Sequence, residues 1–179
     1  FGRYSFIGLP AEKKIGVWGD TVTLFKKKEI IDKVCCDPLN FVEDYISKFS
    51  PSPEVYELPR FCGGLAGYFG YDVVRLVEPR LKKHLRAKEN NLLIPDILLL
   101  EVRDMIVFDN YTGELTLIVF ANPEERSAFQ QAEKKLDLME VSLSKTLTIP
   151  ELGGCTATEI IRRFSKEEFE KSVLKAQEY

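Results

Sequence analysis

Residues 60–79 decide the fold of this chain, and their sequence is Arg-Phe-Cys-Gly-Gly-Leu-Ala-Gly-Tyr-Phe-Gly-Tyr-Asp-Val-Val-Arg-Leu-Val-Glu-Pro. Four glycines lie among aromatic residues here, at Gly63, Gly64, Gly67 and Gly70. Because side chains alternate between the two faces of a β-strand, residues 65–72 place small residues and large rings in alternation. Glycine in such a strand lets a ring or a neighbouring backbone approach closely. The stretch therefore predicts a packed core strand that extends through residue 72.

The glycine pattern does not match a nucleotide-binding loop. A Walker A loop needs Lys and then Ser or Thr after its last glycine, whereas a dinucleotide fingerprint opens with G-x-G and is followed by a helix. Residues 60–79 contain neither pattern. We therefore interpret these glycines as structural.

Strand signals recur along the rest of the chain. The apolar and β-branched patterns predict strands at residues 3–8, 14–25, 97–108 and 114–120. The second of these is predicted to be a hairpin that turns at Gly19-Asp20, and the last two are joined through residues 110–113. These are the signals of an antiparallel sheet.

Helix signals separate the predicted strands. Asp37 and Pro38 are typical of an N-cap and a first helical position, and Pro51 and Pro53 should end that helix. Its apolar face is predicted to comprise Phe41, Val42, Tyr45, Ile46 and Phe49. A second helix is expected from Asn122-Pro123, with Phe129, Ala132 and Leu136 as its buried stripe.

A third helix start lies near the end of the chain. Ser165 and Glu168 have the spacing of a capping box, and Phe169, Val173 and Ala176 form an apolar stripe that needs a partner. Together these patterns predict the α+β class, with antiparallel sheet and helices packed on it.

Composition limits the possible functions. A chain of 179 residues, 45% hydrophobic and 30% charged, suits one domain with a substantial core. Its formal charge of −3, from 25 basic and 28 acidic residues, gives no electrostatic footprint for nucleic acid or an anionic membrane. The longest apolar runs are too short to span a membrane, and the N-terminus lacks a signal-peptide pattern. We expect a cytoplasmic protein.

Few residues suggest independent catalytic or metal chemistry. The four cysteines, among them Cys155, include no C-x-x-C pair, so we expect free thiols and no metal site. His84 lies in a basic run that we interpret as an exposed charged segment. Asp72 and Glu78 could flank a cleft, but a surface ion pair with Arg75 explains them equally well. We therefore expect no catalytic residue in this chain.

Two further features have simple structural interpretations. Lys26-Lys27-Lys28 is expected to be a solvated turn that discourages pairing at a sheet edge. The single tryptophan, Trp18, is expected to lie in the core.

Residues 63–78 resemble the Gly-Gly-x-x-Gly-Tyr-Phe-Gly-Tyr-Asp-x-x-Arg block of anthranilate synthase component I. Further blocks resemble the same family in the same order: Gly-Arg-Tyr-Ser-Phe-Ile-Gly at residues 2–8, Pro-Asp-Ile-Leu-Leu at 95–99, and Phe-Asp-Asn at 108–110 with Gly113. The resemblance implies an enzyme of tryptophan biosynthesis, a carbon–oxygen lyase that converts chorismate to anthranilate and pyruvate. It also implies ammonia supplied by a glutamine amidotransferase partner (component II), a requirement for Mg²⁺, and feedback inhibition by tryptophan.

The resemblance also implies that this chain is the N-terminal part of such an enzyme. We expect a regulatory domain at residues 1–150, a linker at 151–163, and at 164–179 the start of a chorismate-binding catalytic domain that is otherwise absent. The first residue is not a methionine and the last lies in an open helix, which we interpret as truncation at both ends. The Mg²⁺ ligands would belong to the absent domain, and this fragment alone is predicted to be inactive.

The resemblance places the tryptophan site near Arg3, Tyr4, Ser5 and Phe6, although the family's upstream Leu-Leu-Glu-Ser segment is missing here. A zwitterionic amino acid needs acceptors for its ammonium, donors for its carboxylate and a slot for its ring. Arg3, Tyr4 and Ser5 offer donors or a wall, although strand alternation puts only two of the three on one side. The alternative is that Tyr4 and Phe6 are core residues.

Two other functions remain open. The corresponding domain of aminodeoxychorismate synthase component I resembles this chain in fold and in the glycine block, residues 63–78, but it serves the folate pathway. The block at residues 3–8 favours anthranilate synthase. A stand-alone amino-acid binding module is a further alternative, against which the open helix at Tyr179 argues.

Overall fold

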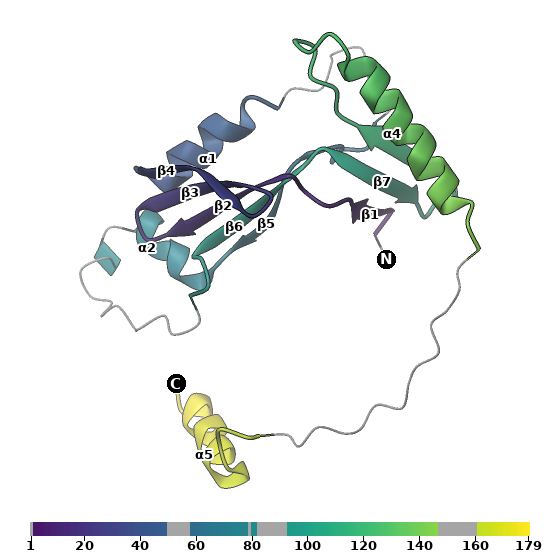
Figure 1. Cartoon of the computed structure of the whole chain (residues 1–179). Coiled ribbons are helices and arrows are strands. Elements are labelled where there is room, and N and C mark those ends of the chain that lie inside the picture. The colour runs from purple at the N-terminus through teal and green to yellow at the C-terminus, as the bar shows by residue number, and fades with distance from the viewer. Residues whose placement is uncertain (1, 50–57, 79, 82–92, 147–160) are drawn as a thin grey trace. The chain divides into compact units, whose positions relative to one another are not determined.

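The computed structural model describes residues 2–49, 58–78, 80–81, 93–146 and 161–179. The chain divides into two compact units, Phe1–Ser144 and Lys145–Tyr179. The first unit contains two antiparallel sheets with helices packed on them (Figure 1). The predicted α+β class is therefore confirmed. The predicted linker at residues 151–163 lies almost wholly outside the described residues.

The larger sheet has five strands in the order β4-β3-β2-β6-β5, all antiparallel. Their bounds are β2 Lys13–Trp18, β3 Thr21–Lys26, β4 Glu29–Cys35, β5 Gly64–Phe69 and β6 Ile97–Val102. The predicted hairpin is confirmed, because β2 pairs with β3 and Gly19 occupies the turn with a φ of +60°. Glycine adopts such an angle without steric cost.

Strand β4 was not predicted from the sequence. Lys27, with a φ of +56°, forms the turn that returns the chain from β3 to β4. The lysine run is therefore a turn, as predicted, but it does not discourage pairing there, because Lys26 of β3 pairs with Glu29 of β4. Strand β4 lacks a clean apolar alternation because Ile30 and Ile31 are adjacent, and the register against β3 shifts between Leu24 and Phe25. All seven of its residues are exposed at the sheet edge.

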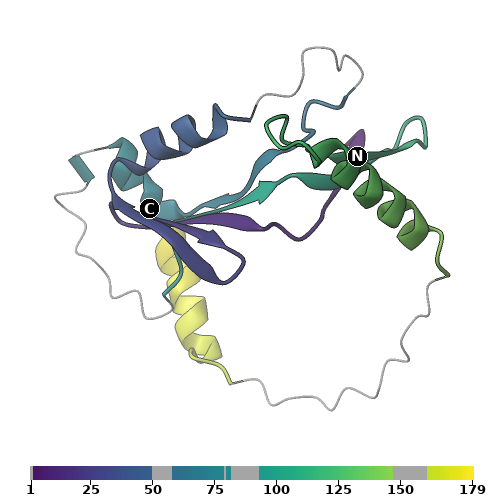
Figure 2. The same cartoon turned by 45° about the horizontal axis from the view of Figure 1, so that its top comes forward.

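The smaller sheet has three strands in the order β1-β7-β8, namely β1 Tyr4–Gly8, β7 Asp104–Asp109 and β8 Leu115–Val119. The prediction of one strand at residues 97–108 was wrong, because Arg103 separates β6 from β7 and each belongs to a different sheet. Figure 2 shows this segment passing from one sheet into the other. No Gly or Pro marks the break in the sequence, and buried apolar residues continue on both sides of it. The break is therefore not visible in the sequence pattern.

Helix α1, Pro38–Ile46, covers one face of the larger sheet (Figure 1). Its cap is as predicted: Asp37 Oδ1 accepts hydrogen bonds from the backbone N–H groups of Leu39 at 2.9 Å and Asn40 at 3.1 Å. The helix ends before Phe49, earlier than expected, and the prolines assigned to its end lie outside the described residues. The core beneath it contains Ile15, Val17, Val22, Ile97 and Leu99, with Leu39, Phe41, Val42 and Tyr45 packed against it.

The glycine block forms a strand only as far as Phe69. Gly70 donates its N–H to the Asp96 carbonyl at 2.7 Å, and Val73 N–H then bonds to the Gly70 carbonyl at 3.1 Å, which begins a helical turn. The chain continues as a 3₁₀ turn, η1 Tyr71–Val73, and a short helix, α2 Val74–Val77. The predicted continuation of the strand through residue 72 was therefore wrong.

Helix α4, Ala128–Leu143, begins six residues later than predicted, after a turn around residues 122–127. Its buried residues are Ala128 and Met139, whereas Phe129 is 75% exposed. Ala132 and Leu136 are half-buried, as expected for the same side of the helix. Phe129 was wrongly assigned to the buried stripe. Each step of one residue along a helix rotates the side-chain direction by about 100°, so Phe129 points away from the side on which Ala128 is buried.

The second unit contains helix α5, Lys166–Gln177, whose predicted capping box is confirmed. Glu168 N–H donates to Ser165 Oγ at 3.2 Å, and Ser165 N–H donates to Glu168 Oε2 at 2.9 Å. Phe169 and Val173 of its apolar stripe are exposed.

Trp18 was wrongly predicted to be a core residue. Its side chain is 37% exposed, lies edge-on to Phe25 at 6.4 Å, and donates from Nε1 to the Leu93 carbonyl at 3.2 Å. Strand alternation explains its position, since the neighbouring Val17 points toward α1 and Trp18 therefore lies on the opposite face of the sheet. We call this side the open face, defined by Trp18, Phe25, Tyr68, Leu98 and Leu100.

Gly67 is where β5 approaches β6 most closely. A Cβ atom at this position would collide with the Leu98 carbonyl oxygen and lie 2.9 Å from its carbonyl carbon and 3.0 Å from Leu99 Cα. Of the two neighbours that a strand glycine can accommodate, a ring or a backbone, Gly67 accommodates the backbone of β6. Backbone in a paired strand cannot move aside without breaking the ladder.

Gly67→Val is expected to destabilise unit 1 by about 3 kcal/mol or more, at the upper end of what overpacking costs. The matched control is Gly8→Val, because a Cβ on Gly8 meets only Val102 Cγ1 at 4.0 Å. Thermal unfolding followed by circular dichroism should show a midpoint roughly 10 °C lower for Gly67→Val. Equal midpoints for the two variants would contradict the close-approach argument.

Candidate functional site

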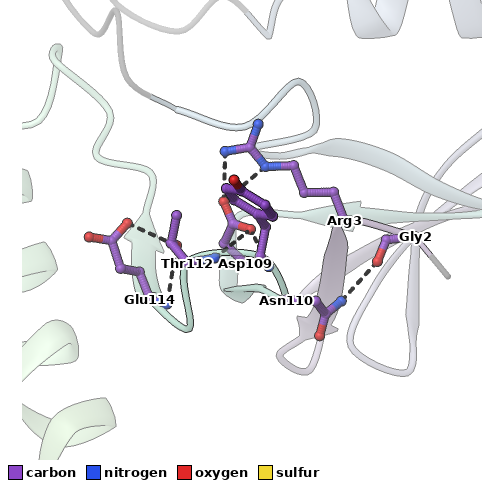
Figure 3. Close-up of polar contacts among 7 residues, drawn as sticks. Gly2, Arg3, Asp109, Asn110, Thr112 and Glu114 are labelled. Carbon is purple, nitrogen blue, oxygen red and sulfur yellow. Dashed lines mark hydrogen bonds and ion pairs between the residues drawn. The ribbon is translucent and has the colours of Figure 1, made fainter.

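The predicted site strand, β1, lies beside the turn that joins β7 to β8. Tyr4 pairs with Asp109 and Ser5 with Phe108, and the backbone N–H of Asn110 donates to the Arg3 carbonyl at 2.7 Å. The first residues of the chain are thereby fixed to the β7–β8 turn, and Figure 3 shows the side chains that meet there.

Asp109 is the centre of this corner. Its Oδ2 accepts from Arg3 Nε at 3.0 Å and from Arg3 Nη2 at 2.9 Å, while its Oδ1 accepts from the backbone N–H of Tyr111 at 2.9 Å (Figure 3). The Asp109 side chain is only 12% exposed, against 57% for Arg3. One carboxylate therefore both shapes the turn and holds the arginine.

The hydrogen bonds from Arg3 lower the pKa of the Asp109 carboxyl below its usual range. Burial acts in the opposite direction, and the N–H groups of Tyr111 and Thr112 add to the lowering. Hydrogen bonds that favour the charged form of a carboxyl group lower its pKa. Asp109 is therefore the ionised partner of Arg3 at neutral pH.

Asn110 joins the corner to Ser5. Its Nδ2 donates to the Gly2 carbonyl at 3.0 Å and to Ser5 Oγ at 3.1 Å. The turn is closed further along, where Thr112 Oγ1 donates to Glu114 Oε2 at 3.1 Å. The polar side chains of Asp109 and Asn110 thus converge on the start of β1.

Two aromatic rings lie next to the Arg3 guanidinium. Its central carbon lies 4.9 Å from the Tyr4 ring centre and 6.0 Å from the Tyr111 ring centre, within the range of cation–π attraction. Gly2, Arg3, Asn110 and Tyr111 line a shallow open depression. The corner offers cationic, amide and aromatic surface, which suits a small polar ligand.

The four residues predicted to bind tryptophan divide between two environments. Arg3 and Ser5 belong to the polar corner, through Asp109 and Asn110. Tyr4 is half-buried and packs on the core cluster of Val102, Met105, Val107 and Ile118. Phe6 is 45% exposed and meets the Phe61 ring edge-on at 5.7 Å.

Sequence reasoning did not include the turn residues Asp109, Asn110 and Tyr111 in the site. The signal was present, because Asp-Asn before a glycine marks a turn whose side chains bond to nearby backbone. Nothing local in the sequence, however, indicates that this turn packs on a strand more than 100 residues earlier.

Of the two acidic residues considered for catalysis, Asp72 forms a surface ion pair with Arg75. Arg75 lies 3.6 Å from Asp72 and 3.4 Å from Asp96, while Glu78 follows the end of α2. Among the residues with described positions, no group of His, Cys, Asp or Glu side chains is arranged to hold a metal ion. His84 lies outside the described residues.

Cys35, Cys36 and Cys62 are free thiols, as expected, and Cys155 is not among the described residues. No helix in the described part of the chain is both long and apolar enough to cross a membrane.

Comparison with known proteins gives one consistent result. Anthranilate synthase component 1 of Neisseria gonorrhoeae is 38% identical over 182 residues, and that of Pseudomonas putida is 37% identical over 185 residues. Both alignments include 100% of this chain. The chain is homologous to anthranilate synthase component I. It spans 36% and 37% of the length of these two relatives.

A solved structure supports the same relationship at the level of fold. The anthranilate synthase component I of Streptococcus pneumoniae superposes with a TM-score of 0.68 at 24% identity, over 99% of this chain and 38% of that one. No protein-family model matches the chain. The resemblance first seen in four short blocks therefore extends over the whole sequence.

Asp109→Asn is expected to lower stability at neutral pH but not in acid. The folded-state pKa of Asp109 lies below the unfolded value of about 3.9, so its stabilisation is fully present above that pH and is lost as the pH falls through the folded-state pKa. Unfolding midpoints measured between pH 7 and pH 3 should show the gap to wild type closing.

The matched control is Asp32→Asn, an exposed aspartate on β4. Its unfolding midpoint should follow that of wild type at every pH. A gap for Asp109→Asn that stays constant from pH 7 to pH 3 would show that the ion pair with Arg3 does not stabilise the fold.

Proposed function

We propose that this chain is the N-terminal part of an anthranilate synthase component I, an enzyme that converts chorismate and glutamine-derived ammonia to anthranilate and pyruvate. The single observation that carries the proposal is the match of the entire chain, at 38% identity, to a protein of that name. A glutamine amidotransferase subunit, component II, is the expected partner, and the cytoplasm the expected location.

We assign the chemical step and the Mg²⁺ ion to the part of the enzyme that lies outside this chain. The relatives are almost three times as long as the matched region, so most of their residues have no counterpart here. Asp72 and Asp96, near the glycine block, are paired with Arg75. We therefore propose no Mg²⁺ ligand among the described residues.

The open face of the larger sheet is the surface we assign to supporting that missing part. Trp18 is 37% exposed, Tyr68 38% and Leu100 41%, and they lie on three adjacent strands, β2, β5 and β6. Helix α1 packs on the opposite face of this sheet. A contiguous apolar face of this kind is typical of a surface that packs against another part of the protein.

The regulatory role is assigned to Arg3, Tyr4, Ser5 and Phe6, as the site of the feedback inhibitor tryptophan. The geometry refines the roles these residues would have. Arg3 is already neutralised by Asp109, so it is suited to forming a wall, and Ser5 Oγ with the Asn110 amide supplies neutral hydrogen-bond partners. Such groups suit reversible binding of an amino acid better than bond breaking.

The two alternative functions predict different reaction products. An aminodeoxychorismate synthase would form a folate precursor in place of anthranilate, and a stand-alone binding module would form neither. The names of the relatives favour the first proposal. Sequencing the gene beyond Tyr179 and assaying the longer protein with chorismate, ammonia and Mg²⁺ separates all three.

The 179-residue chain alone is expected to convert no chorismate. Anthranilate is fluorescent, so its formation can be followed directly in a mixture of chain, chorismate, ammonium chloride and MgCl₂. The longer protein under identical conditions is the positive control. Turnover by the short chain that a substitution within it abolishes would overturn the assignment of chemistry to the missing part.

Ser5→Phe in the longer protein, assembled with its amidotransferase partner, is expected to weaken tryptophan inhibition about tenfold with a nearly unchanged uninhibited rate. An inhibitor shifts a conformational equilibrium only by its differential binding, and one lost contact worth about 1.4 kcal/mol corresponds to that factor. The measurement is initial rate against tryptophan concentration. Ser5 is exposed, so the substitution should not unfold the protein.

Two outcomes would remove Ser5 from the tryptophan site. One is an unchanged half-inhibition concentration. The other is a loss of uninhibited rate as large as the loss of inhibition in a well-folded variant, which would make this strand part of the scaffold.

A further inference from the structure

The larger sheet ends in two edge strands, β4 and β5, and only β4 is protected against pairing with a further strand (Figure 1). Strand β4 contains Glu29, Asp32 and Lys33. Its register against β3 also shifts between Leu24 and Phe25. Charged residues and irregularities of this kind are the usual means by which proteins keep an edge strand from pairing with another chain.

Strand β5 has none of these protective features. Its sequence, Gly-Leu-Ala-Gly-Tyr-Phe, contains no charged residue and no proline, and it pairs with β6 in one unbroken register. Gly67, Tyr68 and Phe69 are exposed, the last of them by 53%. An exposed apolar edge strand is a template on which another strand can pair. The two edges of one sheet therefore differ, and β5 is the edge that is open to a partner.

The outward-pointing backbone groups of β5 follow from the ladder. Residues in an antiparallel pair alternate between hydrogen-bonded and non-hydrogen-bonded positions. Gly70 N–H donates to the Asp96 carbonyl at 2.7 Å, in register with the β5–β6 pairs, so Gly70 is at a hydrogen-bonded position. Counting back by single residues makes Leu65, Gly67 and Phe69 non-hydrogen-bonded positions. Their N–H and C=O groups point away from β6, and no strand in the described part of the chain pairs with that side.

The relatives indicate where a partner strand would come from. This chain spans 36% and 37% of two of them, so most of their length lies outside it. The open face, which we assign to supporting that missing part, includes Tyr68 of β5 and so extends to this edge. Polypeptide that packs on the open face would therefore lie next to the exposed half of β5.

We propose that the outer edge of β5 pairs with a β-strand from the part of the longer protein that lies outside this chain. The larger sheet would then continue past β5. The inference rests on the proposed function, since it takes this chain to be the N-terminal part of a longer enzyme. Main-chain hydrogen bonds to Gly67 and Phe69 supply the affinity, as in other cases of strand addition to a sheet edge.

The test is hydrogen–deuterium exchange of single amides, compared between the 179-residue chain and the longer protein. Mass spectrometry with electron-transfer fragmentation resolves neighbouring residues. The N–H groups of Ala66 and Tyr68 point toward β6 and should exchange slowly in both proteins. Those of Gly67 and Phe69 should exchange fast in the short chain and about 100-fold or more slowly in the longer protein.

The matched control is Lys33 on the opposite edge of the same sheet. Cys36 N–H donates to the Asp20 carbonyl at 3.1 Å, and the same alternation makes Lys33 an outward-pointing position of β4. Because β4 is the protected edge, Lys33 N–H should exchange fast in both proteins.

A substitution tests the same pairing through stability. Phe69→Pro removes an outward N–H group but no hydrogen bond to β6, which is the situation in which an edge strand tolerates proline. Phe69→Ala removes only the ring and is its control. The two variants of the short chain should unfold at similar temperatures, whereas in the longer protein Phe69→Pro should unfold at least about 2 °C below Phe69→Ala. If Phe69→Pro does not fold, the exchange of the unsubstituted proteins still decides the question.

Fast exchange of Gly67 and Phe69 in a longer protein that forms anthranilate would overturn the proposal and leave the proposed function intact. Slow exchange in a longer protein that forms no anthranilate would support the pairing and contradict the function. Protection that grows with the concentration of the short chain would make a second copy the partner. Protection that requires the amidotransferase subunit would make that subunit the partner, and either result would overturn the proposal.

Discussion

The segment from Ile97 to Asp109 is the constraint on which the rest of unit 1 depends. As β6 it lies between β2 and β5 in the larger sheet, and as β7 it is the central strand of the smaller one. No other strand of the described chain continues directly from one sheet into the other. Its apolar residues Ile97, Leu99 and Met105 are at most 3% exposed and contribute to both core clusters. The two sheets are therefore joined by one continuous stretch of backbone, and packing on either side must adapt to it.

The glycines of the glycine block are explained by the pairing of β5 with this segment. Gly67 lies opposite Leu99 in the β5–β6 ladder, and its missing side chain is what allows β5 to pair so closely with β6. Where that pairing ends, Gly70 bonds to the Asp96 carbonyl and the chain turns into a helix. The glycines thus serve strand pairing and its termination. This is why their spacing resembles neither of the phosphate-binding patterns with which glycine clusters are commonly associated.

Sequence reasoning predicted the elements whose signals are local. The Gly19 turn, the Asp37 cap and the Ser165–Glu168 capping box depend on a few neighbouring residues, and all three are confirmed. Strand β4 and the break at Arg103 were missed because each is decided by pairing with distant strands. For the candidate site, the sequence predicted the strand but omitted the turn at Asp109, since their contact joins residues 106 positions apart. The error at Phe129 has another cause, because that residue and the buried Ala128 are adjacent and both apolar, so composition does not show which one faces the sheet.

The same central segment, Ile97 to Asp109, contains three acidic residues that form ion pairs. Glu101, Asp104 and Asp109 follow one another along it, and each is paired with a cation from elsewhere in the fold or from the junction: Arg103, Lys135 and Arg3. A buried carboxylate is tolerated only when its charge is compensated. The pairs with Lys135 and Arg3 also fix α4 and the start of β1 against the segment. Glu101 and Asp109 have all the partners they need within the protein. Asp104 does not, since its buried Oδ1 has no hydrogen-bond partner among the described residues, and it lies between the two sheets, where α4 meets the junction. Its other oxygen, Oδ2, nonetheless joins α4 to the junction through Lys135.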